Sequence, residues 1–337
     1  MNNRQENVLV TGGAGFIGSR VAKELKTCGY TVVVLDDLSG GFKENIPAGI
    51  KFVRGSINDV ALLSEIFERH RFHYVFHLAA YAAEGLSHFI KRFNYMNNVV
   101  GSVNLINESV KHHVRCFVFT SSIAVYGTNQ LPLTEDMIPM PEDSYGIAKL
   151  AVELELKASW KMFGLDYIIF RPHNVYGEYQ NIGDKYRNVV GIFMNNVMQN
   201  KPLAIFGDGS QTRAFTYIND VAPIIARAIE HTECYGEIFN IGAKQPHTIN
   251  DLAQIVMKTM RKKVDVIHLK ERNEVKHAYC GHNKLEKFFG RPQYVDLKEG
   301  TRRMALWVKK TGVRKSVEFK NIEIYKNLPA SWKGKAQ

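Results

Sequence analysis

A hydroxyl-rich strand end and a tyrosine–lysine pair are the residues of this chain best suited to chemistry. An apolar run ends in the hydroxyl residues 120–122, and the later segment SYGIAK places Tyr145 four residues before Lys149. Residues four apart share a helix face, so the ammonium lies beside the phenol. A free tyrosine has a pKa near ~10, and a cation about 5 Å away lowers it by about two units. Burial of the phenol opposes this effect, so the cations must outweigh it.

The order of these groups along the chain indicates proton transfer to or from a hydroxyl. The pattern predicts Tyr145 as general base, Lys149 as the cation that favours its phenolate, and Ser122 as the residue that orients a substrate hydroxyl. Ser122 lies at the carboxyl end of a strand, where sheets of this kind bind ligands.

A glycine loop near the start of the chain predicts a dinucleotide site. TGGAGFIG places Gly12, Gly15 and Gly18 between a strand and a helix, where the backbone can approach a pyrophosphate and the helix offers free N–H groups. Asp36 ends the second strand about twenty residues further on, where a carboxylate accepts ribose hydroxyls and repels a 2′-phosphate. NAD is therefore favoured over NADP. The alternative is that Asp36 and Asp37 are only turn residues.

The elements that position these groups alternate along the first half of the chain. Apolar runs predict strands at 7–12, 31–37, 50–55, 74–80, 115–122 and 165–172, and amphipathic segments predict helices at 16–29, 59–70, 94–113 and 146–163. Apolar runs without alternation, separated by helices, indicate a parallel sheet covered on both faces. The predicted fold class is α/β, a Rossmann-type doubly wound parallel sheet with a smaller, interwoven C-terminal substrate lobe.

The second half reads as that lobe. Residues 173–188 form a long loop of the kind that binds ligands, followed by helices at 189–199, 220–230 and 248–260 and a strand at 236–242. We expect an NAD-binding domain over 1–175 with returns near 215–242, and a substrate-binding lobe over 176–214 and 243–312. The basic tail, 313–337, carries no functional signal.

Composition limits the class of protein. The chain has 337 residues, 45% apolar and 23% charged, and no apolar run of membrane-spanning length. Its polar N-terminus shows no secretory signal, so we expect a cytoplasmic protein with no membrane partner. Cys28, Cys116, Cys234 and Cys280 lack metal-like spacing, so we expect free thiols and no metal site. The net charge of +11 is concentrated in the last quarter, where stacking aromatics are sparse; this favours a solvated basic face over a nucleic-acid partner.

Six motifs between about Val8 and Lys310 resemble the extended short-chain dehydrogenase/reductase family, and most closely its UDP-glucose 4-epimerase branch. They are TGGAGFIG, HLAA (77–80), NNVVGSVNL (97–105), TSSIAVYG (120–127), SYGIAK and FRPHNVYG (170–177). The resemblance implies a Rossmann domain that binds NAD, a lobe that binds a UDP-sugar, and a homodimer built on two long helices.

The resemblance also implies roles for individual positions. Ser122, Tyr145 and Lys149 match the catalytic trio. The cofactor positions, besides Tyr145 and Lys149, are Gly12, Gly15, Phe16, Ile17, Gly18, Asp36, Asp37, Leu38, Ser39, Gly40, Ile57, Leu78, Ala79, Ala80, Asn97 and His173. The substrate positions are Ser122, Asn174, Val189, Arg213 and Arg272. The two arginines suit a pyrophosphate because a guanidinium is a bidentate, permanently charged donor.

The two residues after Ser122 separate reaction classes. Relatives that dehydrate nucleotide-sugars carry an acid directly after the catalytic hydroxyl residue, whereas Ile123 and Ala124 can transfer no proton. This leaves redox at C4 alone: Tyr145 takes the C4 hydroxyl proton, hydride passes to NAD, the 4-keto sugar turns, and hydride returns to the opposite face. Two alternatives stay open: a dehydratase or 4-reductase that uses non-standard acids such as Glu84, and a catalytically silent NAD-binding regulator.

The sugar stays open between glucose, an N-acetylhexosamine and a uronate. The chain departs from the family's pattern at Ser56, Ala82, Glu84, His173 and Ala214. We expect Glu84 to form a salt bridge or to contact the sugar. Either Ala278 or Tyr279 falls at the position whose size admits or excludes an N-acetyl group.

Overall fold

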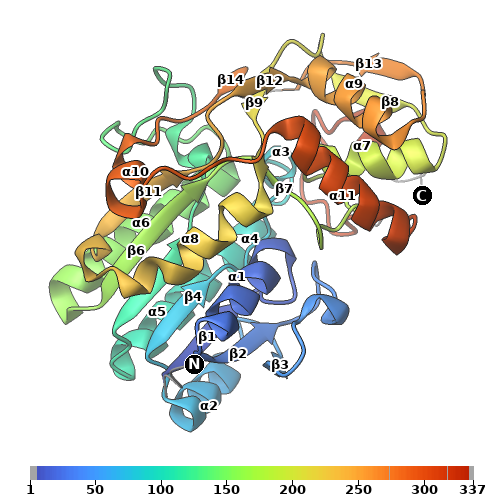
Figure 1. The fold of residues 1–337 in the computed structure, drawn as a ribbon. Coiled ribbons are helices and arrows are strands. Elements are labelled where there is room, and N and C mark those ends of the chain that lie inside the picture. Colours follow the sequence, from blue (N-terminus) through green and yellow to red (C-terminus); the bar gives the residue numbers. More distant parts are fainter. Residues whose placement is uncertain (1–5, 273, 317, 334–337) are drawn as a thin grey trace.

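The computed structural model describes residues 6–272, 274–316 and 318–333 (Figure 1). Residues 1–5, at the start of the predicted cofactor domain, and 334–337, at the end of the predicted tail, lie outside the described residues. In the described part, seven parallel strands form one sheet in the order β3-β2-β1-β4-β5-β6-β11. Their bounds are β1 Asn7–Thr11, β2 Thr31–Asp36, β3 Lys51–Arg54, β4 Tyr74–His77, β5 Cys116–Thr120, β6 Asp166–Pro172 and β11 Glu237–Ile241.

Side chains of each strand alternate between two apolar layers. Val8 and Val10 of β1 face the layer with α1 and α8, whereas Leu9 faces the layer with α2, α5 and α6. The first layer contains α1 Phe16–Thr27 and α8 Ala222–Arg227, and the second contains α2 Val60–His70, α5 Gly101–Lys111 and α6 Ser144–Phe163 (Figure 1). Both faces of the sheet are therefore covered, which explains the apolar runs without alternation and confirms the predicted doubly wound α/β fold.

The helix predicted over 94–113 is one continuous rod with a wider turn inside it. It consists of α4 Lys91–Tyr95, a π-helical turn Met96–Val100 and α5. The amide of Asn98 donates to Asn94 Oδ1 at 2.7 Å and also to the carbonyl of Tyr81, so polar side chains fill the interior at the turn. Single π turns of this kind occur often at functional sites. Here the turn carries Asn97 to the wall of the cavity described below.

The remaining elements form the lobe and its connections. Their bounds are α3 Glu84–Ser87, β7 Val175–Tyr176, α7 Val189–Met198, β8 Leu203–Phe206, β9 Thr212–Ala214, β10 Thr216–Tyr217, β12 Pro246–Thr248, α9 Ile249–Met260, β13 Val266–Leu269, β14 His277–Ala278, α10 Asn283–Phe289 and α11 Leu297–Thr311. Short 3-10 turns occupy Lys43–Asn45, Ile123–Tyr126, Ile218–Asp220, Ala228–Glu230, Thr232–Cys234 and Ala330–Trp332. The lobe sheets have the orders β12-β9-β14 and β13-β8, and β10 pairs with β7. Helix α9 begins with a capping box between Thr248 and Asp251.

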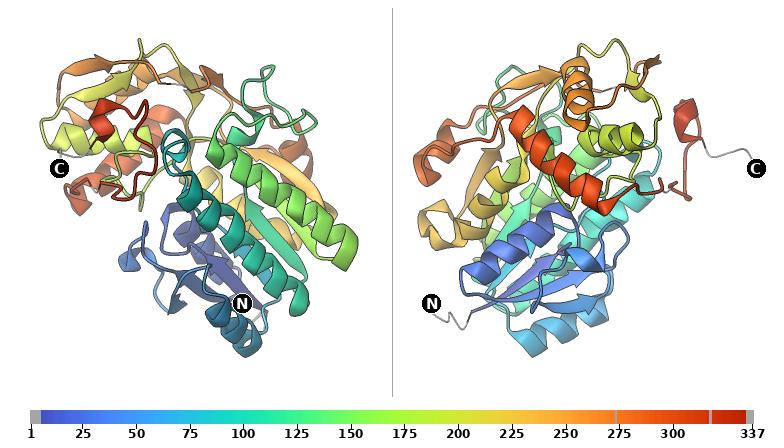
Figure 2. Two further views of the ribbon diagram at one scale, coloured as in Figure 1. Left: turned by 180° about the vertical axis from the view of Figure 1, so that it is seen from behind. Right: turned by 45° about the vertical axis from the view of Figure 1, so that its right-hand side comes forward.

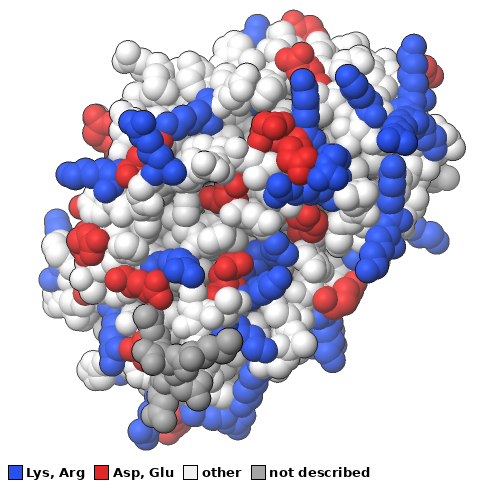
Figure 3. Space-filling model, in the orientation of Figure 1, with Lys and Arg blue, Asp and Glu red and all other residues white. Residues whose placement is uncertain are grey.

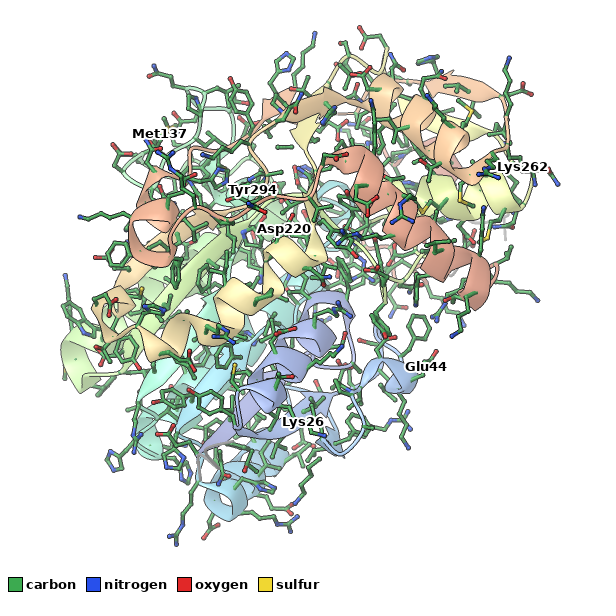
Figure 4. All side chains as sticks on the ribbon, in the orientation of Figure 1. Lys26, Glu44, Met137, Asp220, Lys262 and Tyr294 are labelled. Carbon is green, nitrogen blue, oxygen red and sulfur yellow. The ribbon has the colours of Figure 1, made fainter. Side chains whose placement is uncertain are left out.

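The lobe shares its core with the sheet domain. The apolar layer that holds α1 and α8 continues without a break into buried residues of α7, α9 and α11. Where the chain passes from α10 to α11 it crosses α8, and Val295 donates its backbone N–H to Asp220 at 2.9 Å. Figure 4 shows Tyr294 beside Asp220 at this crossing. Burial raises the pKa of Asp220 to about 6. The hydrogen bond between Val295 and Asp220 thus fixes the lobe directly to the sheet domain.

The chain does not leave the molecule after α11. Residues 313–316 and 318–333, here named the C-terminal segment, run back beside α3 and α7 (Figure 2). Leu328 and Trp332 are each 5% exposed and pack with Ala83, Leu86 and Ile90. The described part of the predicted tail is thus anchored by two buried side chains, while most of its other residues are exposed.

The surface carries its excess of positive charge in a dispersed form. Figure 3 shows Lys and Arg side chains among acidic ones, denser toward the edge where α9 and α11 lie. Among the described residues, no helix has both the length and the apolar character to cross a bilayer. The four cysteines form no disulfide with one another, and Cys116, Cys234 and Cys280 are buried.

Candidate active site

A cavity of about 650 Å³ lies between the carboxyl ends of the sheet strands and the lobe. Its volume is typical of small-molecule sites. The structure brings nearly all of the predicted site residues to its wall. They are Gly12, Gly15, Phe16, Ile17, Gly18, Asp36, Asp37, Ser39, Gly40, Ile57, Leu78, Ala79, Ala80, Asn97, Ser122, Tyr145, Lys149, Asn174, Val189, Arg213 and Arg272.

Two predicted cofactor residues, Leu38 and His173, do not line this cavity. The backbone N–H of Leu38 donates to Asp36 Oδ1 at 2.8 Å. The side chain of His173 is buried behind the wall, with Nδ1 3.0 Å from the carbonyl oxygen of Ala214 and Nε2 3.1 Å from Nε2 of His282. Burial lowers the pKa of His173 to about 4, so both rings stay neutral and stack. The side chain of His173 thus packs against His282 and does not reach the cavity wall.

The first turn of α6 holds Tyr145 against the end of β5. Asp143 caps the helix and accepts the backbone N–H groups of Tyr145 and Gly146, both at 2.9 Å. Lys149, one turn later, donates from Nζ to the carbonyl oxygen of Thr120 at 2.8 Å, and Nζ lies 5.7 Å from the centre of the Tyr145 ring. Ser122 follows β5, where its hydroxyl caps the short turn after the strand. Helix and strand together thus bring the three predicted catalytic side chains to one wall.

Burial dominates the protonation of this trio. It raises the pKa of Tyr145 above its usual value; a hydrogen bond with Ser122 lowers it only in part, and the carboxylates of Asp143 and Glu84 raise it further. Burial also lowers the pKa of Lys149 to about 7. Enclosing both groups disfavours both charges, so burial opposes the phenolate as expected, and Lys149 by itself does not outweigh it. A phenolate at Tyr145 needs a further positive charge in the cavity.

A buried ion pair fixes α6 relative to the strand ends. Arg171 of β6 donates to Glu153 of α6 from Nε at 2.9 Å and from a terminal nitrogen at 2.5 Å. Ser121, next to the predicted catalytic serine, donates to the same carboxylate at 2.5 Å. The side chains of Arg171 and Glu153 are 2% and 1% exposed. This network joins β5, α6 and β6, the three elements that carry the trio and its support.

The glycine loop leaves no room for side chains. A Cβ on Gly18 would lie 2.1 Å from the carbonyl oxygen of Gly12, and one on Gly12 would lie 2.6 Å from the backbone nitrogen of Ala79. Asp36 accepts the N–H of Ala14 at 3.0 Å as well as that of Leu38, which fixes its carboxylate at the cavity wall. A backbone cradle at a helix N-terminus followed by a fixed carboxylate suits a dinucleotide with a free ribose 2′-hydroxyl. The residues present therefore fit NAD.

Two residues of the cavity wall each contain a buried, unpaired polar atom. Thr120 Oγ1 and Arg272 Nε are buried and have no hydrogen-bond partner among the described residues, and both residues line the cavity. Buried polar atoms in proteins are normally paired, and these two are enclosed by protein in this conformation, so each is a polar group that the fold leaves unpaired. Thr120 lies at the trio, and Arg272 lies in the lobe.

The lobe end of the cavity is cationic. Arg272 pairs with Glu274 at 3.0 Å, and Arg213 approaches the same carboxylate at 3.7 Å. The Arg272 guanidinium lies 4.1 Å from the centre of the Phe206 ring. Two guanidinium groups that share one carboxylate keep excess positive charge, which suits a diphosphate.

Sequence reasoning missed several residues of the cavity wall. Arg187 lies within the long loop predicted to bind ligand, forms an ion pair with Asp184, and places its guanidinium 4.9 Å from the centre of the Tyr81 ring. Its charge acts to lower the pKa of Tyr145. Phe206 and Trp332 also line the cavity. In the sequence, only the length of the loop indicated that Arg187 could contact a ligand, and no feature indicated a role for Trp332.

Three residues bear on the choice of sugar: Glu84, and the pair Ala278 and Tyr279, one of which was expected to determine whether an N-acetyl group fits. Glu84 points into the cavity and forms no salt bridge or side-chain hydrogen bond with the described residues, so the expected salt bridge is absent. The Glu84 carboxyl is open to the cavity, but protein surrounds it on its other sides. This burial raises its pKa, and the negative charge of Asp143 raises it further. Neither Ala278 nor Tyr279 lines the cavity.

Fold and site together define a dinucleotide-binding α/β protein of the short-chain dehydrogenase/reductase class. The chain belongs to the NAD-dependent epimerase/dehydratase family, whose model matches residues 8–242. It is 35% identical over 305 residues to a putative UDP-glucose 4-epimerase of Methanocaldococcus jannaschii, which covers 90% of this chain and 98% of that protein.

Solved structures agree with this assignment. The UDP-glucose 4-epimerase of Thermotoga maritima, solved with UDP-glucose, has a TM-score of 0.86 and 34% identity, covering 90% of this chain and 99% of its own. The UDP-glucuronic acid 4-epimerase of Bacillus cereus, solved with UDP-glucuronic acid and NAD, has a TM-score of 0.83 and 29% identity, covering 91% and 100%.

Proposed function

We propose that this protein is an NAD-dependent 4-epimerase of a UDP-hexose. The observation that carries the proposal is the meeting of Ser122, Tyr145 and Lys149 on one cavity wall, with Ile123 and Ala124 where a proton-transferring acid would otherwise follow. Support comes from the relatives described above, which are named as 4-epimerases of UDP-glucose and UDP-glucuronate.

The cofactor site consists of the glycine loop and Asp36. The N-terminus of α1 would hold the pyrophosphate, and the Asp36 carboxylate would accept the ribose hydroxyls. NAD, when bound, accepts a hydride from C4 of the sugar and later returns it.

The protein's own residues supply position and proton transfer. Tyr145 Oη takes the proton of the C4 hydroxyl and later gives it back, while Ser122 Oγ holds that hydroxyl in place. Lys149, fixed on the Thr120 carbonyl, keeps positive charge near the phenol. Arg213 and Arg272 hold the diphosphate, so the 4-keto sugar can turn without leaving the site.

Incubation of the pure protein with NAD and UDP-glucose in D₂O tests this function. We expect the C4 epimer with unchanged mass and no deuterium at C4, because the hydride returns from the cofactor and not from solvent. Loss of water, deuterium at C4, or no conversion of UDP-glucose, UDP-N-acetylglucosamine or UDP-glucuronate would contradict it.

A dehydratase that uses Glu84 is the second candidate. The observation that favours it is an unpaired carboxyl in the cavity whose pKa is raised, since such a group can carry a proton near neutral pH. Glu84→Gln distinguishes the two. It would abolish a water-losing reaction, whereas an epimerase that relies on Tyr145 keeps its turnover of UDP-glucose.

We also propose that the enzyme is a cytoplasmic homodimer. Cys116, Cys234 and Cys280 are buried as free thiols, which suits a reducing compartment. Helices α5 and α6 lie on the same face of the sheet, and α6 exposes Ile147 and Leu154, seven residues apart, while the turn before α5 exposes Met96 and Val100. These exposed apolar side chains form a stripe on two neighbouring helices. A second copy of the chain can bury it, because an isologous interface brings the same stripe of both protomers together.

A further inference from the structure

The C-terminal segment is attached to elements that line the cavity. Its first anchor is Arg314, whose guanidinium lies 3.6 Å from the centre of the Phe42 ring and also contacts Glu44, labelled in Figure 4. The backbone of Arg314 exchanges two hydrogen bonds with the amide of Asn195 on α7, at 2.9 and 3.1 Å.

Further anchors follow along the segment. Phe319 donates its N–H to the Tyr186 hydroxyl at 3.1 Å, in the long cavity loop. Glu323 accepts the backbone N–H groups of Arg92 and Phe93 at the start of α4, at 2.8 and 2.9 Å, as a helix cap. A chain end fixed at successive points along its length is held in one path, and that path ends at Trp332.

Trp332 ends this path beside Arg272. The Arg272 guanidinium lies 5.3 Å from the centre of the Trp332 ring and 4.1 Å from that of Phe206. The Trp332 ring also packs edge-to-face on Tyr186, with centres 5.4 Å apart, and leaves only glycine-sized space at Gly85, where a Cβ would lie 3.2 Å from it. The indole is therefore fixed from several sides and can in turn fix the guanidinium.

We propose that Trp332 is a positioning residue for the nucleotide-sugar: it holds Arg272 against Phe206 so that the guanidinium faces a diphosphate in the cavity. This inference rests on the proposed function. Arg272 lines the cavity, and among the described residues its ion-pair partner is Glu274, reached by one terminal nitrogen, so the other terminal nitrogen remains for an anion. The Phe206 and Trp332 rings also contact each other edge-to-face, with centres 6.1 Å apart, so the guanidinium lies in the corner that they form. An arginine held against two aromatic rings loses less side-chain freedom on binding, which strengthens binding. The family resemblance runs to about Lys310, before the segment begins.

UDP itself is the probe for this proposal, measured by calorimetry with the full-length protein. Trp332→Ala should weaken UDP binding by about tenfold and raise KM for the UDP-sugar more than it lowers kcat, while NAD affinity stays unchanged. Trp332→Phe should restore part of the affinity. Tyr325→Ala, an exposed aromatic residue of the same segment, is the matched control and should bind UDP as the wild type does.

A double-mutant cycle separates positioning from general stability. If Trp332 acts through Arg272, the variant with both Trp332→Ala and Arg272→Ala should bind UDP no more weakly than Arg272→Ala alone. Wild-type affinity in Trp332→Ala, or an effect that adds in full to that of Arg272→Ala, would overturn the proposal. Loss of NAD binding in Trp332→Ala would also overturn it, because it would indicate general misfolding. Failure of the wild type to bind UDP would instead overturn the proposed function.

Discussion

The ammonium of Lys149 donates a hydrogen bond to the backbone carbonyl oxygen of Thr120 at 2.8 Å, inside a wall where Lys149 is only 3% exposed. Burial lowers the pKa of this lysine to about 7, whereas in the unfolded chain it titrates at about 10.5. Between these values the unfolded state binds more protons than the folded state. The penalty from Lys149 is therefore fully present below pH 7 and is relieved as the pH rises toward 10.5.

Lys149→Met removes this titrating group, so the free energy of unfolding should depend less on pH in the variant than in the wild type. We expect the free energy of unfolding of the cofactor-free wild type, relative to Lys149→Met, to rise from pH 7 to pH 10 by up to about 1.4 kcal/mol per pH unit. Urea unfolding at several pH values measures it. Lys161→Met, an exposed lysine of the same helix, should run parallel to the wild type. Parallel curves for Lys149→Met would contradict the lowered pKa.

Removal of the phenolic oxygen should stop chemistry without emptying the site. Tyr145→Phe keeps the ring that packs beside Lys149 but removes the proton acceptor, so turnover should fall by about 10²–10⁴-fold. NAD and UDP affinities, measured by calorimetry, should stay within about twofold of the wild type. A Phe variant that turns over at the wild-type rate would exclude Tyr145 as the base.

The sheet, its helices and the glycine loop could be predicted because their signals are local. Apolar runs such as 31–35 mark buried strands, and TGGAGFIG permits a backbone contact that any other residue would prevent. Most predicted site residues reach the cavity for the same reason, since parallel strands end at one edge of the sheet.

The rest depended on contacts between distant parts of the chain. Trp332 meets Arg272 only because the C-terminal segment returns across the lobe, and no periodicity announces such a return. His173 matched a cofactor position by motif, yet packing against His282, 109 residues away, keeps its side chain behind the wall. The sequence places a cation beside Tyr145 and indicates that burial opposes the phenolate, but spacing does not show how far burial raises the pKa of this phenol.

The buried pair of Glu153 and Arg171 should be essential for stability. Glu153→Gln removes the charge that compensates a guanidinium only 2% exposed, so the free energy of unfolding should fall by about 3–5 kcal/mol. Urea denaturation measures the loss. The double variant Glu153→Met and Arg171→Met should recover part of it, because no uncompensated charge stays buried. Glu155→Gln, on the surface of the same helix, is the control and should change stability by less than about 0.5 kcal/mol.

The apolar stripe on α6 should control the oligomeric state. Leu154 is 56% exposed, so Leu154→Glu leaves the core of one protomer intact but places a charge in the middle of the proposed dimer interface. We expect light scattering to give a dimer mass for the wild type and a monomer mass for the variant. Leu306→Glu, at an equally exposed leucine on α11, should stay dimeric. A monomeric wild type would refute the proposed dimer.

Glu84 should make the enzyme prefer sugars without a carboxylate. The Glu84 carboxylate interacts electrostatically with Arg213, Arg272 and Asp143, and it also raises the pKa of Tyr145. Glu84 therefore lies near both the arginines and the phenol. A hexose whose diphosphate is bound by the arginines and whose C4 hydroxyl meets the phenol passes beside this carboxylate. Like charges repel, and kcat/KM for UDP-glucuronate should therefore be at least about tenfold below that for UDP-glucose. Because the pKa of Glu84 is raised, a larger fraction of this carboxyl is ionised as the pH rises, so the preference for UDP-glucose over UDP-glucuronate should be stronger at pH 8.5 than at pH 6.

Glu84→Gln should bring the kcat/KM values for the two sugars closer together and remove this pH dependence. Glu142→Gln, a second carboxylate change on the cavity wall, tests whether the effect belongs to Glu84. A wild type that prefers UDP-glucuronate would exclude this role.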